Sequence, residues 1–186
     1  MQFFNEEDFK VANQRRREDL LVYFALSFFS KREAYTRMPE NLKRDIKEHF
    51  GKYTQARDEG KNNLFSISNT ENIQAACIEA NKILPKSTLN GNHDLIIHKK
   101  YLNDCPVILR IYIGCALQLY GDLEEVSLIK AHIHSGKVTL MVFDDWDKQV
   151  PLLTERIKIK LREQDIDFFD YYGDYSPVEF EFKKSY

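Results

Sequence analysis

Two kinds of hydrophobic spacing divide this chain, one on each side of Gly121. Before that residue, apolar side chains recur every three or four positions, which is the spacing of one face of an amphipathic helix. The pattern predicts helices over about residues 6–30, 40–50, 53–62, 70–84 and 101–120. The last of these is dense in Val, Ile, Leu and Ala, so we expect it to be a buried central helix.

After Gly121 apolar and polar residues alternate, as they do in strands with one buried face. The alternation predicts two hairpins, which comprise residues 126–134 with 137–143 and residues 157–161 with 166–169. A short strand is predicted at 94–98, residues 86–93 form a predicted polar turn region, and VEFEF near the end is a candidate edge strand.

These elements predict an α+β fold. N-terminal helices and one buried central helix would pack on a mostly antiparallel meander sheet of about four to five strands. The length of 186 residues favours a single domain over residues 1–186, with a helical part at 1–85 and a helix-plus-sheet part at 86–186.

Composition and cysteine usage restrict the binding partners and the cellular compartment that we expect for the protein. The 27 basic and 29 acidic residues give a formal net charge of -2, so any contact with nucleic acid would have to be a local patch. Cys77, Cys105 and Cys115 are odd in number and lie in apolar contexts, which favours a reducing cytoplasm. No segment reaches the roughly 18 apolar residues of a membrane span, so we expect no membrane partner.

The seven glycines never occur as G-x-G, and no P-loop is present. The glycine-rich turns that hold nucleotide-shaped cofactors are therefore missing, and we expect no cofactor. No G-x-S-x-G motif occurs, and each cysteine has the apolar setting of a structural thiol. The sequence assigns no catalytic residue and favours a protein without its own enzymatic activity.

Basic residues and histidines alternate along two predicted strands, so their side chains should share strand faces. The residues that we select for binding nucleic acid or another anion are Lys130, His132, His134, Lys137, Arg156, Lys158, Lys160 and Arg162. Nearby Phe168, Tyr171 and Tyr172 would help to bind a phosphate backbone. The same pattern is also typical of solvated strand faces. We expect no metal, because His132 and His134 lack an evident third ligand.

Four segments in one order carry a resemblance to a known family. They are SKREAYTRMPENLKRDIKEHFGKY, NLFSIS, DLIIHKKYLNDCPVILRIYIGCALQLYGDLEEVSLIKAHIHSGKVTLMVFDDWD and KIKLREQDIDFFDY. Over about Tyr23 to Tyr175 the chain resembles the C-terminal region of the DNA phosphorothioation-associated putative methyltransferase family. The shared motifs are short and collinear, among them Gly-Cys-Ala, Tyr-Gly-Asp and Lys-x-His.

The chain also departs from that family. Family members carry an upstream methyltransferase-like part with a glycine-rich cofactor loop, which we expect to be missing here. Their tail tends to end in a Pro-x-x-His-Arg-Lys-like run, whereas Pro177 is followed by VEFEFKK. The resemblance thus implies a stand-alone accessory region, associated with sulfur-modified DNA and its defence systems, without S-adenosylmethionine chemistry.

Three functional hypotheses follow. The first is an accessory module of a DNA modification or defence system that binds DNA or a partner protein of that system. The second is a metal-dependent nuclease or hydrolase that uses His132, His134 and nearby acids. The third is a structural domain that forms a homodimer through an edge strand or its aromatic tail.

Overall fold

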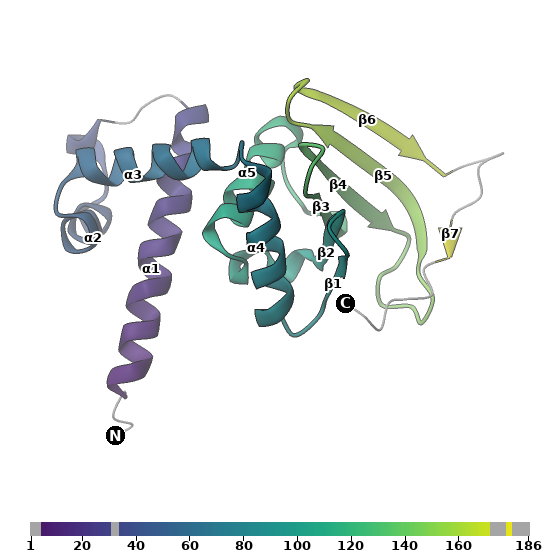
Figure 1. Cartoon of the computed structure of the whole chain (residues 1–186), viewed down its shortest axis with the longest axis horizontal. Helices are drawn as coiled ribbons and strands as arrows, with labels where there is room; N and C mark the ends of the chain where they lie inside the picture. Colours follow the sequence, from purple (N-terminus) through teal and green to yellow (C-terminus); the bar gives the residue numbers. More distant parts are fainter. Residues whose placement is uncertain (1–4, 31–33, 172–177, 180–186) are drawn as a thin grey trace. The chain divides into compact units, whose positions relative to one another are not determined.

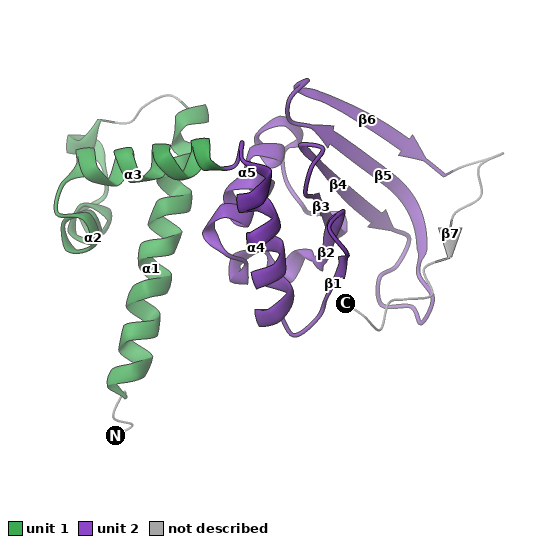
Figure 2. Cartoon of the chain, viewed as in Figure 1, with its two compact units in different colours: residues 1–66 green, residues 67–186 purple. Residues whose placement is uncertain are grey.

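The computed structural model of the chain describes residues 5–30, 34–171 and 178–179. Contacts within the chain group its residues into two compact units, Met1–Ser66 and Ile67–Tyr186 (Figure 2). The division falls after the third helix, so the fourth helix groups with the sheet. The organisation as a single domain stays a prediction.

Unit 1 is helical (Figure 1). Its elements are α1 (Glu6–Leu26), the 3₁₀ turns Ser27–Phe29 and Tyr35–Arg37, α2 (Glu40–Phe50) and α3 (Tyr53–Ser66). Asn5 caps α1 by accepting a hydrogen bond from the backbone N–H of Glu7, and Gly51 ends α2 with a φ of 72°. The predicted helices of this region are therefore present, and α3 continues beyond its predicted end.

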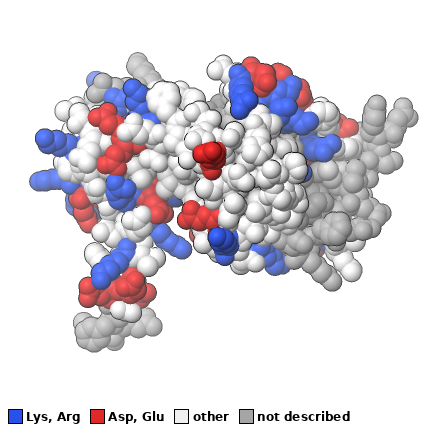
Figure 3. Space-filling model, in the orientation of Figure 1, with Lys and Arg blue, Asp and Glu red and all other residues white. Residues whose placement is uncertain are grey.

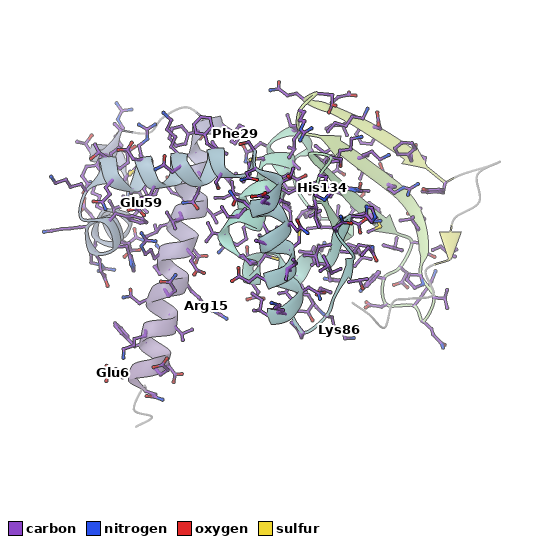
Figure 4. The ribbon with its side chains drawn as sticks, viewed as in Figure 1. Glu6, Arg15, Phe29, Glu59, Lys86 and His134 are labelled. Carbon is purple, nitrogen blue, oxygen red and sulfur yellow. The ribbon has the colours of Figure 1, made fainter. Side chains whose placement is uncertain are left out.

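Only the second half of α1 is packed within the described structure. Leu20, Leu21, Phe24 and Ala25 are buried, whereas every residue from Glu6 to Arg16 is exposed. Figure 4 shows Glu6 and Arg15 on the stretch of α1 that extends beyond α2 and α3. The aromatic rings of Phe50 and Tyr53 meet the ring of Phe24 edge-on, with centroid distances of 6.2 and 6.0 Å, and so form the centre of this unit.

Unit 2 is a meander sheet with helices on one face. Its helical elements are α4 (Thr70–Ile83), the 3₁₀ segment Lys99–Asp104 and α5 (Val107–Tyr120). Its strands are β1 (Ser87–Asn90), β2 (Asp94–His98), β3 (Val126–His132), β4 (Lys137–Phe143), β5 (Leu152–Lys160), β6 (Asp165–Asp170) and β7 (Val178–Glu179). None of the described helices has the length and apolar character needed to cross a membrane.

Strands β1 to β6 pair in chain order, each antiparallel to the next, and β7 pairs with the start of β5. The predicted α+β fold with an antiparallel meander is confirmed, with slightly more strands than expected. The additional strand is β1, in the region predicted as a polar turn. Residues 180–182 of the candidate edge strand VEFEF lie outside the described part of the chain.

The main core of unit 2 lies between the sheet and the pair α4 and α5 (Figure 1). Alternate residues of the strands point into it, among them Leu95, Ile129, Leu140 and Ile157, each fully buried. The predicted central helix α5 contributes Leu109, Tyr112 and Ile113 to the same core, and its burial is confirmed. Residues between these core positions on each strand must therefore point to the opposite face of the sheet.

Candidate functional site

The strand register brings the two predicted basic segments onto one face of the sheet. Lys130 of β3 lies opposite Thr139 of β4, and Thr139 lies opposite Lys158 of β5. Directly paired residues project from the same face, and the adjacent row of Ile129, Leu140 and Ile157 points into the core. We call the face that carries Lys130 and Lys158, away from α4 and α5, the outer face.

Six of the eight predicted site residues share this outer face. By the same register they are Lys130, His132, Lys137, Arg156, Lys158 and Lys160. The other two, His134 and Arg162, lie in the turns that follow β3 and β5, where an Arg162 N–H donates to the carbonyl oxygen of His134 at 3.5 Å. The structure thus joins residues about 30 positions apart in sequence into one surface.

The outer face has an apolar part and a polar part. The apolar part is a small second core that consists of Ile96, Leu128, Met141, Phe143 and Leu153, with Trp146 and Tyr171 packed against it. The apolar part lies beside the first residues of β3, which include Leu128. The polar part lies toward the turn between β3 and β4, and it holds the lysines.

Carboxylates of neighbouring strands neutralise two of these lysines. The ammonium of Lys130 lies 3.8 Å from a carboxylate oxygen of Asp94 on β2. The ammonium of Lys160 lies 3.1 Å from Asp165 and 2.8 Å from Asp167, both on β6. In Figure 3, basic and acidic side chains lie side by side at the end of the sheet where β5 turns into β6.

Two lysines of the polar part remain available for an external anion. Lys137 and Lys158 have no carboxylate within ion-pairing distance among the described residues. Lys137 is adjacent to Lys160 across the β4–β5 pair, and Lys158 occupies the next row of the same face. An anion placed over these rows would meet positive charge from two strands at once.

An exposed aromatic ring adjoins the lysines. Phe169 of β6 lies opposite Arg156 of β5, and it is 37% exposed. The Lys158 ammonium lies 5.0 Å from the centroid of the Phe169 ring, and the Arg156 guanidinium lies 5.8 Å from it. Arg156 also lies 5.8 Å from the ring of Tyr171. Cations and aromatic rings therefore share one surface.

His132 makes a side-chain hydrogen bond on the outer face. Its Nε2 lies 3.0 Å from the hydroxyl oxygen of Thr139, which is 2% exposed. Burial lowers the pKa of His132 most, and the charges of Lys130 and Lys158 lower it further, while Asp94 acts in the opposite direction. His132 therefore serves as a neutral hydrogen-bonding partner on the outer face at physiological pH.

The groups considered for metal binding do not come together. In the described ranges, no group of three or more His, Cys, Asp and Glu side chains has the arrangement of a metal site. Asp144, an acid that directly follows β4, caps the β4–β5 connection, since it accepts hydrogen bonds from Lys148 at 2.6 Å and from the backbone N–H of Leu152 at 2.9 Å. The hydrogen bond from Lys148, with those from backbone N–H groups, lowers the pKa of Asp144 to about 2.

The three cysteines are free and buried within unit 2. Burial raises the pKa of Cys77, Cys105 and Cys115 to about 12 in each case, so their thiols stay protonated at neutral pH. A protonated, enclosed thiol is a poor nucleophile. The structure therefore favours the structural interpretation of these residues.

Sequence reasoning missed the partners on the outer face. Asp94, Thr139, Asp165 and Asp167 have no motif, and only the strand register places them beside the lysines. Among the predicted aromatic residues, Phe168 lies opposite Ile157 on the core-facing side, Tyr171 adjoins the apolar part, and Tyr172 lies outside the described residues. The exposed ring on the outer face belongs to Phe169, the residue that follows Phe168.

Comparison with known proteins gives no match to a family model, to a curated protein or to a solved structure. The geometry of the outer face and the sequence resemblance are therefore the two indications of function.

Proposed function

We propose that this chain binds nucleic acid through the polar part of the outer face, as an accessory module of a cytoplasmic DNA modification or defence system linked to phosphorothioation. The single observation that carries the proposal is the pair Lys137 and Lys158, which lie on adjacent strands of one face without a carboxylate partner in the described structure. Phosphate oxygens are the anionic groups that lysines of this kind contact on nucleic acid.

The charge of the outer face supports the proposal. Its described cationic side chains are Lys130, Lys137, Arg156, Lys158 and Lys160, and its described carboxylates are Asp94, Asp165 and Asp167. This surface therefore has a positive balance, although the whole chain has a formal net charge of -2. Because carboxylates occupy part of it, we expect modest affinity rather than the tight binding of a strongly basic protein.

The assignment to a phosphorothioation-linked system rests on the sequence resemblance described above. The buried, reduced state of the three cysteines supports the cytoplasmic setting. A sulfur-modified phosphate keeps its negative charge, so the same lysines would contact plain and modified DNA.

Fluorescence anisotropy with labelled oligonucleotides tests the proposal. Plain and phosphorothioated DNA, as duplexes and as single strands, are titrated with the whole chain between about 50 and 200 mM salt. We expect binding that weakens as salt increases, because phosphate contacts release counterions. The double substitution Lys137→Glu with Lys158→Glu should weaken binding roughly tenfold or more, since it replaces two attractive charges with repulsive ones.

The matched control is the double substitution Lys82→Glu with Lys86→Glu. Both of these lysines are exposed and lie outside the outer face, at the end of α4 and just before β1. This variant has the same total charge as the test variant, so it should bind nearly as well as the unmodified chain if the outer face is the site. Equal losses in both variants, salt-independent binding or no binding would contradict the proposal.

A further inference from the structure

We infer that the nucleic acid bound by the outer face is single-stranded, with one base stacked on the ring of Phe169. This inference rests on the proposed function and adds the class of nucleic acid to it. Its starting point is the exposed ring of Phe169 on the same face as Lys158 and Arg156.

A duplex offers this ring no partner. In a double helix the base faces are covered by stacking on their neighbours, whereas a single strand can present them to an aromatic side chain. Within the described part of the chain, Phe169 lies on the edge strand β6, and the sheet continues on one side of it only. A base can therefore approach the exposed ring from the open side of the sheet.

The cations lie where the adjoining phosphates would run. Arg156 lies opposite Phe169, and Lys158 lies two residues further along β5, about 7 Å away along the strand. Lys137 extends the positive surface onto β4, and Lys130, which is paired with Asp94, lies beyond it on β3, with neighbouring strands about 5 Å apart. A strand lying across the sheet from Phe169 would meet these side chains in turn.

The ring of Phe169 is already occupied by a flexible cation that can move. The Lys158 ammonium rests 5.0 Å from the ring centroid and has no carboxylate partner in the described structure. When a base stacks on the ring, this ammonium moves to a backbone phosphate, which is the stronger partner for it. The exchange costs one cation–π contact and forms a stacked base and a charge-assisted hydrogen bond.

Neighbouring Phe168 is a matched internal control. It belongs to the same edge strand and is 58% exposed, which is more than Phe169. Its side chain projects from the core-facing side, where its ring centroid lies 6.4 Å from that of Tyr120 on α5. The effect on binding of removing an exposed phenyl ring can thus be compared between the two faces of β6.

The experiment measures the affinity of the whole chain for single-stranded DNA, single-stranded RNA and duplex DNA of one sequence. We expect at least one single strand to bind more tightly than the duplex. Phe169→Ala should weaken single-strand binding by about fivefold to a hundredfold, since base stacking on an aromatic ring contributes a factor of this size. Phe168→Ala should leave it nearly unchanged. Phe169→Leu keeps apolar bulk without a π face and should behave like Phe169→Ala.

The outcomes separate this inference from the proposed function. If the duplex binds at least as tightly as both single strands, or if Phe169→Ala and Phe168→Ala have equal effects, the single-strand inference is overturned. The proposed function survives that result when Lys137→Glu with Lys158→Glu still weakens binding. If no oligonucleotide binds, both fail. Circular dichroism spectra of each variant verify that the chain remains folded.

Discussion

The hydroxyl of Tyr112 on α5 lies 2.9 Å from the backbone carbonyl oxygen of His132 at the end of β3. The same hydroxyl lies 3.0 Å from the carbonyl oxygen of Lys137 at the start of β4. One phenol thus links the central helix to both strands of the hairpin that carries the candidate site. Burial raises the pKa of Tyr112 above its ordinary value, so it remains a hydrogen-bond donor.

Substitution of Tyr112 by Phe should lower the free energy of unfolding by about 1–2 kcal/mol, because two part-buried carbonyl groups lose the O–H donor that they share. Urea denaturation followed by circular dichroism measures the change. Tyr120→Phe is the control, since the Tyr120 hydroxyl makes no hydrogen bond to a described residue. A Tyr112→Phe variant as stable as the unmodified chain would show that the hairpin does not need this contact.

Gly60 of α3 is predicted to tolerate no side chain. A Cβ added there would lie 2.6 Å from the Cβ of Phe24 and 2.9 Å from the backbone nitrogen of Ala25. Overpacking should cost about 1–3 kcal/mol, and alanine contributes up to about 1 kcal/mol to the helix, so the net effect of Gly60→Ala should be a destabilisation of unit 1 by up to about 2 kcal/mol. Thermal unfolding and hydrogen exchange of unit 1 measure this effect.

The control for Gly60→Ala is Asp58→Ala in the same helix, at an exposed position. It should change the stability of unit 1 by only a few tenths of a kcal/mol, because no close packing is involved. If Gly60→Ala stabilises the protein as a normal glycine-to-alanine change in a helix does, the close approach of α1 and α3 is not present.

The stability of the protein should fall as pH drops below 6.5, the ordinary pKa of histidine. Burial lowers the pKa values of both His132 and His98 in the folded chain, so the unfolded chain binds more protons in this range. Each histidine can contribute at most about 1.4 kcal/mol per pH unit between its folded and unfolded pKa values. Above pH 6.5 this contribution is fully present.

Denaturation between about pH 5 and 8 measures this dependence. His132→Gln should reduce its slope, while His98 continues to contribute to it. His134→Gln removes an exposed histidine two residues from His132 and is the matched control. An unchanged slope in His132→Gln would mean that the imidazole is as accessible to protons in the folded chain as in the unfolded one.

The elements of the fold could largely be predicted because their hydrophobic periods are strong. α2 begins and ends at its predicted residues, and α4, β3 and β4 differ from prediction by at most two residues. α5 ends at its predicted residue but begins at Val107 rather than Tyr101, because Lys99–Asp104 form a 3₁₀ segment. β1 was missed because STLN has no apolar alternation, and its strand conformation depends on pairing with β2. β5 begins at Leu152 rather than Ile157, in a stretch whose alternation is weak.

Local periodicity determined which residues of a strand share a face, and it therefore placed Arg156, Lys158 and Lys160 together from the sequence alone. Only the tertiary structure decided that Lys130 lies in the same cross-strand row as Lys158, and that Asp165 and Asp167 neutralise Lys160. The physical reason is that a period of two fixes the side of a strand but not its neighbours. Register depends on the packing of the whole sheet against α4 and α5, and it decides which charges meet.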